Sequence, residues 1–141
     1  MANEIMVANE TQIVATSDFA IPRGYVCTVD ISTIEGKKAV MNAINGGVSL
    51  ADYESDTFNV VDIITTAGVR SRTGEACTNT YLILDDGTTL FTQSDGVKRS
   101  VDTIVALFSG PNGVDFGDGI PLKTVVQKLP NGNTLRTLIM P

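Results

Sequence analysis

The sequence predicts an all-β domain with one helix, because the second part of the chain is a series of short β-type segments separated by turns. Five segments within residues 57–140 are rich in β-branched, aromatic and leucine residues and are bounded by glycine, asparagine, aspartate or proline. One stretch between the third and fourth segments instead has apolar residues at helical spacing. The predicted order is therefore strand, strand, strand, helix, strand, strand.

The first three predicted strands lie close together in the sequence. The first is 57–65 (TFNVVDIIT), and a long polar loop, 68–78, follows it. The second strand, 79–84 (NTYLIL), and the third, 88–93 (TTLFTQ), are joined by the tight turn 85–87 (DDG).

The predicted helix follows Ser94, whose hydroxyl can cap it. Its apolar residues recur at helical spacing and form one stripe: Val97, Val101, Ile104, Val105 and Phe108. Pro111 comes after the stripe and prevents the helix from continuing. The fourth and fifth strands are expected at 122–129 (LKTVVQKL) and 134–140 (TLRTLIM).

This element order is that of an OB-fold, a five-stranded Greek-key barrel that often binds single-stranded nucleic acid. We therefore expect an OB-fold nucleic-acid-binding domain in residues 57–141 and an N-terminal β extension in residues 1–56. Within that extension, strands are predicted at 11–16 and 25–31, and 37–44 is ambiguous between a helical turn and an extended segment.

The register of the second and third strands decides which side chains share a face. A three-residue turn puts Leu82, Leu84 and Leu90 on one face and places Tyr81 beside Phe91 on the other. A two-residue turn instead pairs Phe91 with Leu82 on the core side. We favour the first register because it gathers the leucines.

Composition argues against an enzyme and against a metal or cofactor site. The chain has no histidine, so Ser-His-Asp and Cys-His catalysis and the commonest zinc ligands are absent. Cys27 and Cys77 lie far apart, and two reduced, buried thiols are expected in preference to a disulfide. The aspartates near residues 85 and 115–118 do not complete a calcium loop, and no phosphate-binding loop motif occurs.

The net charge of −6 is unevenly distributed. Most of the excess acid lies in residues 1–56, whereas residues 57–141 are close to neutral and their bases are grouped. An acidic total weakens binding to duplex DNA, which depends mainly on phosphate neutralisation, but single strands can also be held by stacking.

The candidate nucleic-acid-binding residues are an arginine pair and an aromatic pair. Arg70 and Arg72 lie in the loop between the first two strands, which borders the usual binding face of an OB-fold, although a solvated loop paired with Glu75 is the alternative. Tyr81 and Phe91 are the stacking candidates if the favoured register holds, and core residues otherwise.

The last two strands supply further bases. Lys123 and Lys128 are five positions apart, so they face opposite sides of a regular strand and only one can line a groove. Arg136 lies on the fifth strand. Each of these bases is also compatible with an ordinary exposed side chain.

The stretch VRSRTGEACTNTYLILDDGTTLFTQSDGVKRS, followed by LPNGNTLRTL, resembles the single-stranded-DNA-binding proteins of tailed bacteriophages. The resemblance covers residues 57–140. It implies an OB-fold that coats exposed strands during phage DNA replication, with Arg70, Arg72, Tyr81, Phe91 and a base from the last two strands in the groove. Many bacterial proteins of this type end in an acidic, partner-recruiting tail, whereas this chain ends in Leu-Ile-Met-Pro, which puts such recruitment in question.

The sequence therefore predicts a sequence-tolerant protein that binds single-stranded DNA and that protects and unwinds exposed strands. Replication proteins and a second copy of the chain are the expected protein partners, since an exposed barrel edge invites pairing. The N-terminus lacks a secretion signal and no apolar run is long enough for a membrane span, so we expect a protein of the cytoplasm, the host's if it is viral. Two alternatives stay open: a phage structural or assembly protein, and a cold-shock-type RNA chaperone.

Overall fold

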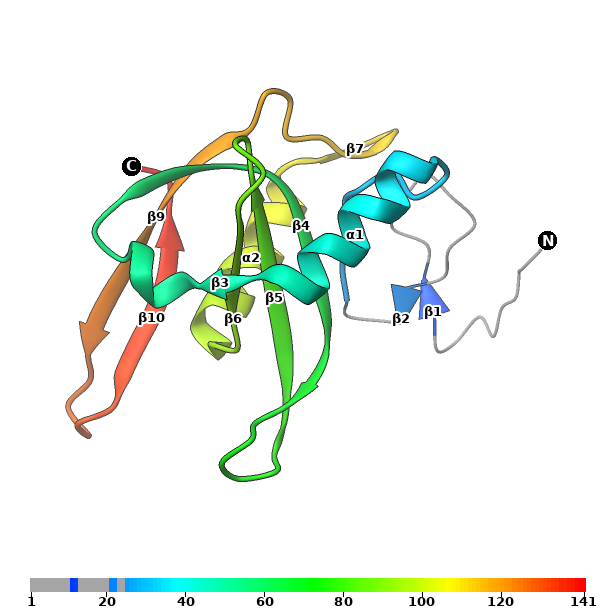
Figure 1. Ribbon diagram of the computed structural model, residues 1–141. Helices are drawn as coiled ribbons and strands as arrows, with labels where there is room; N and C mark the ends of the chain where they lie inside the picture. Colours follow the sequence, from blue (N-terminus) through cyan, green and yellow to red (C-terminus); the bar gives the residue numbers. More distant parts are fainter. Residues whose placement is uncertain (1–10, 13–20, 23–24) are drawn as a thin grey trace.

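The computed structural model describes residues 11–12, 21–22 and 25–141 and is mainly β, with two α-helices (Figure 1). Residues 1–10 and most of the predicted strand 11–16 lie outside the described residues. None of the helices in the described part is long and apolar enough to cross a membrane.

A six-stranded mixed sheet forms the body of the protein, in the spatial order β10-β9-β4-β5-β6-β3. The strands of this sheet are β3 (Val48–Ser49), β4 (Thr57–Val69), β5 (Ala76–Leu84), β6 (Thr89–Thr92), β9 (Ile120–Lys128) and β10 (Thr134–Ile139). Two small pairs complete the strands: β1 (Thr11–Gln12) with β2 (Ile21–Pro22), and β7 (Ser109–Gly110) with β8 (Gly113–Val114).

The sheet curls into a half-barrel and does not close, so the predicted closed five-stranded barrel is wrong. β6 takes the short parallel strand β3 at its free edge instead of β10. The free edge of β10 is met by serine side chains from the α2 region: the Ser94 hydroxyl donates to the Arg136 carbonyl, and the Leu138 N–H donates to Ser100 Oγ at 3.0 Å. These two bonds satisfy one carbonyl and one N–H on the edge of β10 that a closed barrel would have paired.

Helix α2 (Asp95–Leu107) fills the hollow of the half-barrel. Ser94 caps it by accepting from the Val97 N–H, as predicted. The buried stripe Val97, Val101 and Ile104 joins the leucines of the sheet in one core cluster. The hairpin register is the favoured one, since Tyr81 pairs with Phe91 and Leu82 with Leu90.

A bend in β4 sends two hairpins toward the same end of the molecule. β4 pairs with β9 only from Thr57 to Val60, and an irregularity between Val60 and Asp62 then turns it away, so that it continues with β5 alone. The β4–β5 and β9–β10 hairpins therefore diverge, and both tips point downward in Figure 1.

The segment 25–49, here called the cover, packs against Ile64 of β4, Tyr81 of β5 and Phe91 of β6, and it ends in the edge strand β3. Tyr25–Ile31 does not form the predicted strand. Val26 nevertheless exchanges bonds with Thr65 of β4, and Cys27 makes an isolated bridge to Ile64. The ambiguous stretch 37–44 is part of helix α1 (Ile34–Gly46), so the expectation of a single helix is also wrong.

Helix α1 packs against the sheet through small residues. Thr33 caps it by accepting from the Gly36 N–H. Ala43, together with Val29 and Ile31 of the preceding segment, buries Ile64 and Tyr81 in a second cluster. A 3₁₀ turn, η1 (Leu50–Tyr53), then leads to β4, and its Leu50 is buried in the main core.

Candidate nucleic-acid interface

The two diverging hairpins and the start of α2 form what we call the open end of the half-barrel. The loop 70–75 joins β4 to β5, and the loop 129–133 joins β9 to β10. The first turn of α2 packs on β10, because Gly96 lies so close to the Arg136 carbonyl that a Cβ atom would come within 2.1 Å of it. The open end thus brings three segments together that are distant in the sequence.

Strand alternation places Lys128 and Arg136 on the inner face of the β9–β10 hairpin. They share their face with Leu122 and Leu138, whose side chains are buried in the core. Val126 pairs with Arg136 on this face and is 45% exposed, because the core ends before it. This face therefore combines two bases with an accessible apolar side chain.

The β4–β5 hairpin presents a comparable surface. Val69 pairs with Ala76 of β5. By strand alternation its side chain is on the same face of β4 as the buried Ile63 and Thr65, but it is 61% exposed. The loop beyond it is closed by a bond from the Arg70 N–H to the Glu75 carbonyl at 2.9 Å, and Gly74 takes a positive φ of 74°.

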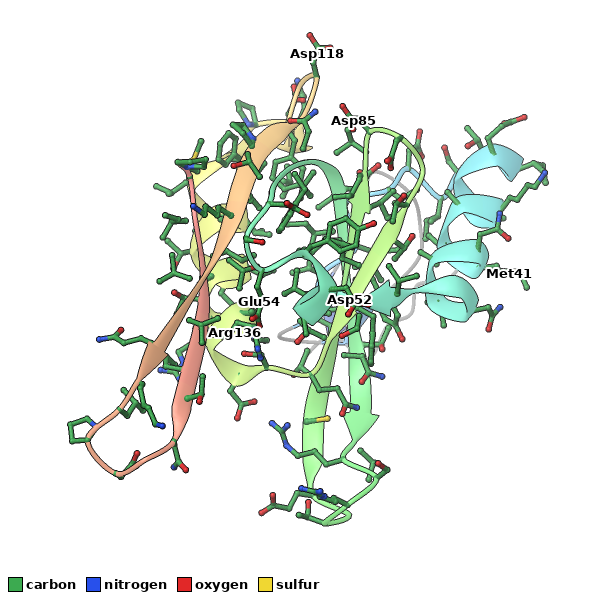
Figure 2. The ribbon with its side chains drawn as sticks, turned by 60° about the vertical axis from the view of Figure 1, so that its left-hand side comes forward. Met41, Asp52, Glu54, Asp85, Asp118 and Arg136 are labelled. Atoms are coloured by element: carbon green, nitrogen blue, oxygen red, sulfur yellow. The ribbon has the colours of Figure 1, made fainter. Side chains whose placement is uncertain are left out.

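Some bases at the open end are paired with acids. Arg70 Nη2 lies 3.1 Å from Asp95 Oδ1, at the first residue of α2. Lys98 Nζ lies 2.7 Å from Asp102 Oδ2, one helical turn further on. The third pair is Arg136 with Glu54, which Figure 2 shows side by side, one on β10 and the other after η1.

Other bases at the open end have no such partner. Among the described residues, no carboxylate lies within 4 Å of the charged atoms of Arg72, Arg99 or Lys128. All three side chains are exposed. A phosphate can bind to these three side chains without breaking an existing ion pair.

Lys123 does not belong to the open end. It pairs with Thr57 and Ile139 at the opposite end of β9, about 17 Å from Lys128 at the usual rise per residue. Its side chain also lies on the opposite face of the strand, as the sequence predicted, because its neighbours Leu122 and Thr124 point into the core.

The two aromatic candidates are side by side but do not form an exposed stacking platform. The rings of Tyr81 and Phe91 have centroids 5.3 Å apart and are tilted by 42°. Tyr81 is only 6% exposed, and the half-buried Phe91 lies under Gly47 of the cover. The favoured register holds, yet it does not leave Tyr81 free for stacking, because the N-terminal segment covers that face of the sheet.

Sequence reasoning gave little weight to the start of α2 and missed the two valines. In the sequence, Lys98 and Arg99 are two basic residues near the start of a predicted helix, where the helix dipole disfavours positive charge. Val69 and Val126 are ordinary strand residues in the sequence, and their exposure follows from the divergence of the hairpins. No local pattern signals that divergence.

The carboxyl and thiol groups with raised pKa values lie between the cover and β4. Burial raises the pKa of Asp62, although a bond from the Thr28 hydroxyl at 2.7 Å opposes the shift. Burial also raises the pKa of the Cys27 thiol. Cys27 and Cys77 are both free thiols, and Cys77 is half-buried.

Comparison with known proteins adds no relative: no protein-family model, no curated protein and no solved structure matches the chain.

Proposed function

We propose that the protein binds single-stranded DNA without sequence preference at the open end of the half-barrel. The observation that carries this proposal is that three separate segments at one end of the molecule each present an exposed, unpaired basic side chain, in a chain whose net charge is −6. Arg72, Arg99 and Lys128 contact the phosphates in this proposal. The nucleobases of the bound DNA pack on the exposed valines, Val69 and Val126.

The element order supports an OB-fold that is opened on one side. The series β4, β5, β6, α2, β9, β10 has the order of an OB-fold, and β3 occupies the edge of β6 where the last strand of a closed barrel would pair. In OB-folds, oligonucleotides bind beside the loops after the first and fourth strands. The corresponding loops here are 70–75 and 129–133, the two tips of the open end.

The proposed binding relies on few phosphate contacts. The three unpaired basic residues alone give a slope of about −2 for log K against log salt, because each phosphate of a single strand contributes about −0.7. A duplex presents a higher charge density but keeps its bases stacked inside, so the valines gain nothing from it. We infer a preference for unpaired strands, which suits a protein that protects a template and removes its hairpins during phage replication.

Titration of a fluorescein-labelled dT oligomer, followed by fluorescence anisotropy, tests the proposal. We expect saturable binding that a single-stranded DNA of mixed sequence competes away and that a hairpin duplex competes away poorly. Equal or better competition by an RNA of the same sequence would indicate the RNA-chaperone alternative. No binding at low salt would contradict the proposal.

A structural or assembly protein is the second candidate, because two apolar surfaces are exposed. Ile34 and Met41 on α1 are 74% and 64% exposed. A groove of about 230 Å³ beside α2 and β10 is lined by Leu107, Ile139 and Met140, among others. For this candidate, sedimentation velocity would show concentration-dependent assembly without any effect of added oligomer.

A further inference from the structure

Glu54 and Asp95 form ion pairs with two arginines of the open end, and a phosphate could form the same kind of ion pair with each arginine. Arg136 Nε donates to Glu54 Oε2 at 2.6 Å, and Arg136 Nη2 donates to the same oxygen. Arg70 Nη2 lies 3.1 Å from Asp95 Oδ1. Guanidinium groups form the same charge-assisted bonds with phosphate oxygens.

Both acids are held in place by the fold. Glu54 follows η1, whose Leu50 is buried in the main core, so the carboxylate is fixed near β10. Asp95 is the first residue of α2, directly after the capping Ser94, where a negative charge is favoured by the helix dipole. Both ion pairs involve the region where α2 meets β10: Asp95 belongs to the first turn of α2, and the Arg136 carbonyl lies against Gly96 of that turn.

The ion pairs are accessible enough to exchange partners. The side chains of Arg70 and Asp95 are 32% and 69% exposed, and those of Arg136 and Glu54 are 28% and 33% exposed. Ion pairs that solvent reaches contribute little to stability, and a phosphate contact can replace that contribution. Exchange therefore costs little, but it is not free.

We propose that Glu54 and Asp95 set the affinity of the open end and its selectivity for chain length, with each acid displaced from its arginine by a phosphate of the bound strand. This inference rests on the proposed binding of single-stranded DNA. A mononucleotide would exchange one ion pair for another and gain almost nothing. A longer strand exchanges the first pair at the same cost and then reaches the second arginine at a high effective concentration.

The test compares Asp95→Asn and Glu54→Gln with Asp118→Asn, which changes the net charge by the same amount. Asp118 is exposed and lies at the end of the molecule opposite to the hairpin tips (Figure 2). We expect each of the two site variants to bind labelled dT oligomer about two- to fivefold more tightly than the wild type, the range that corresponds to an exposed ion pair. Asp118→Asn should bind like the wild type.

An Arg70→Ala background identifies the arginine through which Asp95 acts. In that background, Asp95→Asn should no longer change the affinity, because no guanidinium remains to be released. An undiminished gain would contradict the exchange. If Glu54→Gln lowers the thermal stability, the Asp95 pair alone decides the outcome, since Asp95 is the more exposed acid.

Competition with thymidine monophosphate tests the selectivity for length. We expect no displacement of the labelled oligomer by millimolar mononucleotide, whereas efficient displacement would overturn the length argument. If the wild type binds the oligomer but both site variants match Asp118→Asn, the role of the acids is wrong and the proposed function stands. If no variant binds, the proposed function itself fails.

Discussion

The ring of Tyr81 lies against that of Phe91 beneath the cover, with a centroid separation of 5.3 Å. Tyr81 is 6% exposed and shares its cluster with Cys27, Val29 and Ala43. Its contacts are therefore those of a core residue.

Replacing Tyr81 with alanine should destabilise the fold by about 3 kcal/mol, the usual cost of removing a buried aromatic ring. Urea denaturation measures this change, and Tyr81→Phe, which keeps the ring, is the matched control. A Tyr81→Ala protein with unchanged stability and lost oligomer binding would show that the ring is a stacking surface after all.

The hairpin around Tyr81 shows how much the sequence could predict. The spacing of Leu82, Leu84 and Leu90 allowed one register that gathers all three, and the structure has that register. Local alternation was enough because the turn and both strands are contiguous in the chain.

Helix α1 and the open barrel could not be predicted in the same way. The buried residues of α1 are Gly36 and Ala43, too small to give an apolar stripe, while its large apolar residues Ile34 and Met41 are exposed. Closure depends on competition for the edge of β6, which the two-residue strand Val48–Ser49 takes from β10. A pairing of that length leaves no pattern in the sequence.

The same reason limits the prediction of the site. Loop position made Arg70 and Arg72 candidates, whereas strand alternation left open whether Lys123 or Lys128 lines a groove. Tyr81 is buried because residues 25–49 pack over it, and that packing is a tertiary contact that the local sequence pattern does not reveal.

The contact between α2 and β10 leads to a prediction about Gly96. A Cβ atom there would lie 2.1 Å from the Arg136 carbonyl oxygen and 2.9 Å from Leu135 Cδ1. Gly96→Ala should therefore push the helix away from the strand and destabilise the fold by about 1–3 kcal/mol.

Gly46 is the matched control for that variant. It ends α1, and a Cβ atom added there has no other atom within 4 Å apart from its own neighbourhood in the helix. Gly46→Ala should be neutral or stabilising by up to about 1 kcal/mol. Thermal melts of both variants give the comparison, and equal melting temperatures would contradict the tight contact at β10.

Asp62 makes stability depend on pH under the cover. Burial raises the pKa of Asp62 in the folded state, so the folded protein holds this proton more tightly than the unfolded chain. The stabilisation from the protonated carboxyl is complete below the ordinary aspartate pKa. It is lost as the pH rises through the raised value.

Asp62→Asn should remove the loss of stability at higher pH, because asparagine does not ionise. The variant keeps a side-chain oxygen that accepts the hydrogen bond from the Thr28 hydroxyl. Urea denaturation should show the variant gaining stability over the wild type at pH 7 and little or none at a pH below the ordinary aspartate value. A gain of equal size at both pH values would mean that ionisation of Asp62 is not the cause. Asp118→Asn, at an exposed site, controls for the change in net charge.

Two lysines on β9 allow the open end to be compared with a site elsewhere on the surface. Lys128 pairs with Thr134 at the open end, whereas Lys123 pairs with Ile139 at the other end of β9. Lys128→Ala should weaken binding of a dT oligomer several-fold and make the salt slope shallower by about 0.7, the contribution of one phosphate. Lys123→Ala should change neither quantity, and equal effects of the two variants would point to non-specific attraction.

The most direct test of the central claim is a ¹H–¹⁵N correlation spectrum recorded while a dT oligomer is added to the wild-type protein. We predict that the shifted amides cluster in residues 67–76, 95–99 and 126–136, which form the open end. Absence of shifts at low salt, or shifts confined to the outer surface of α1, would contradict the account.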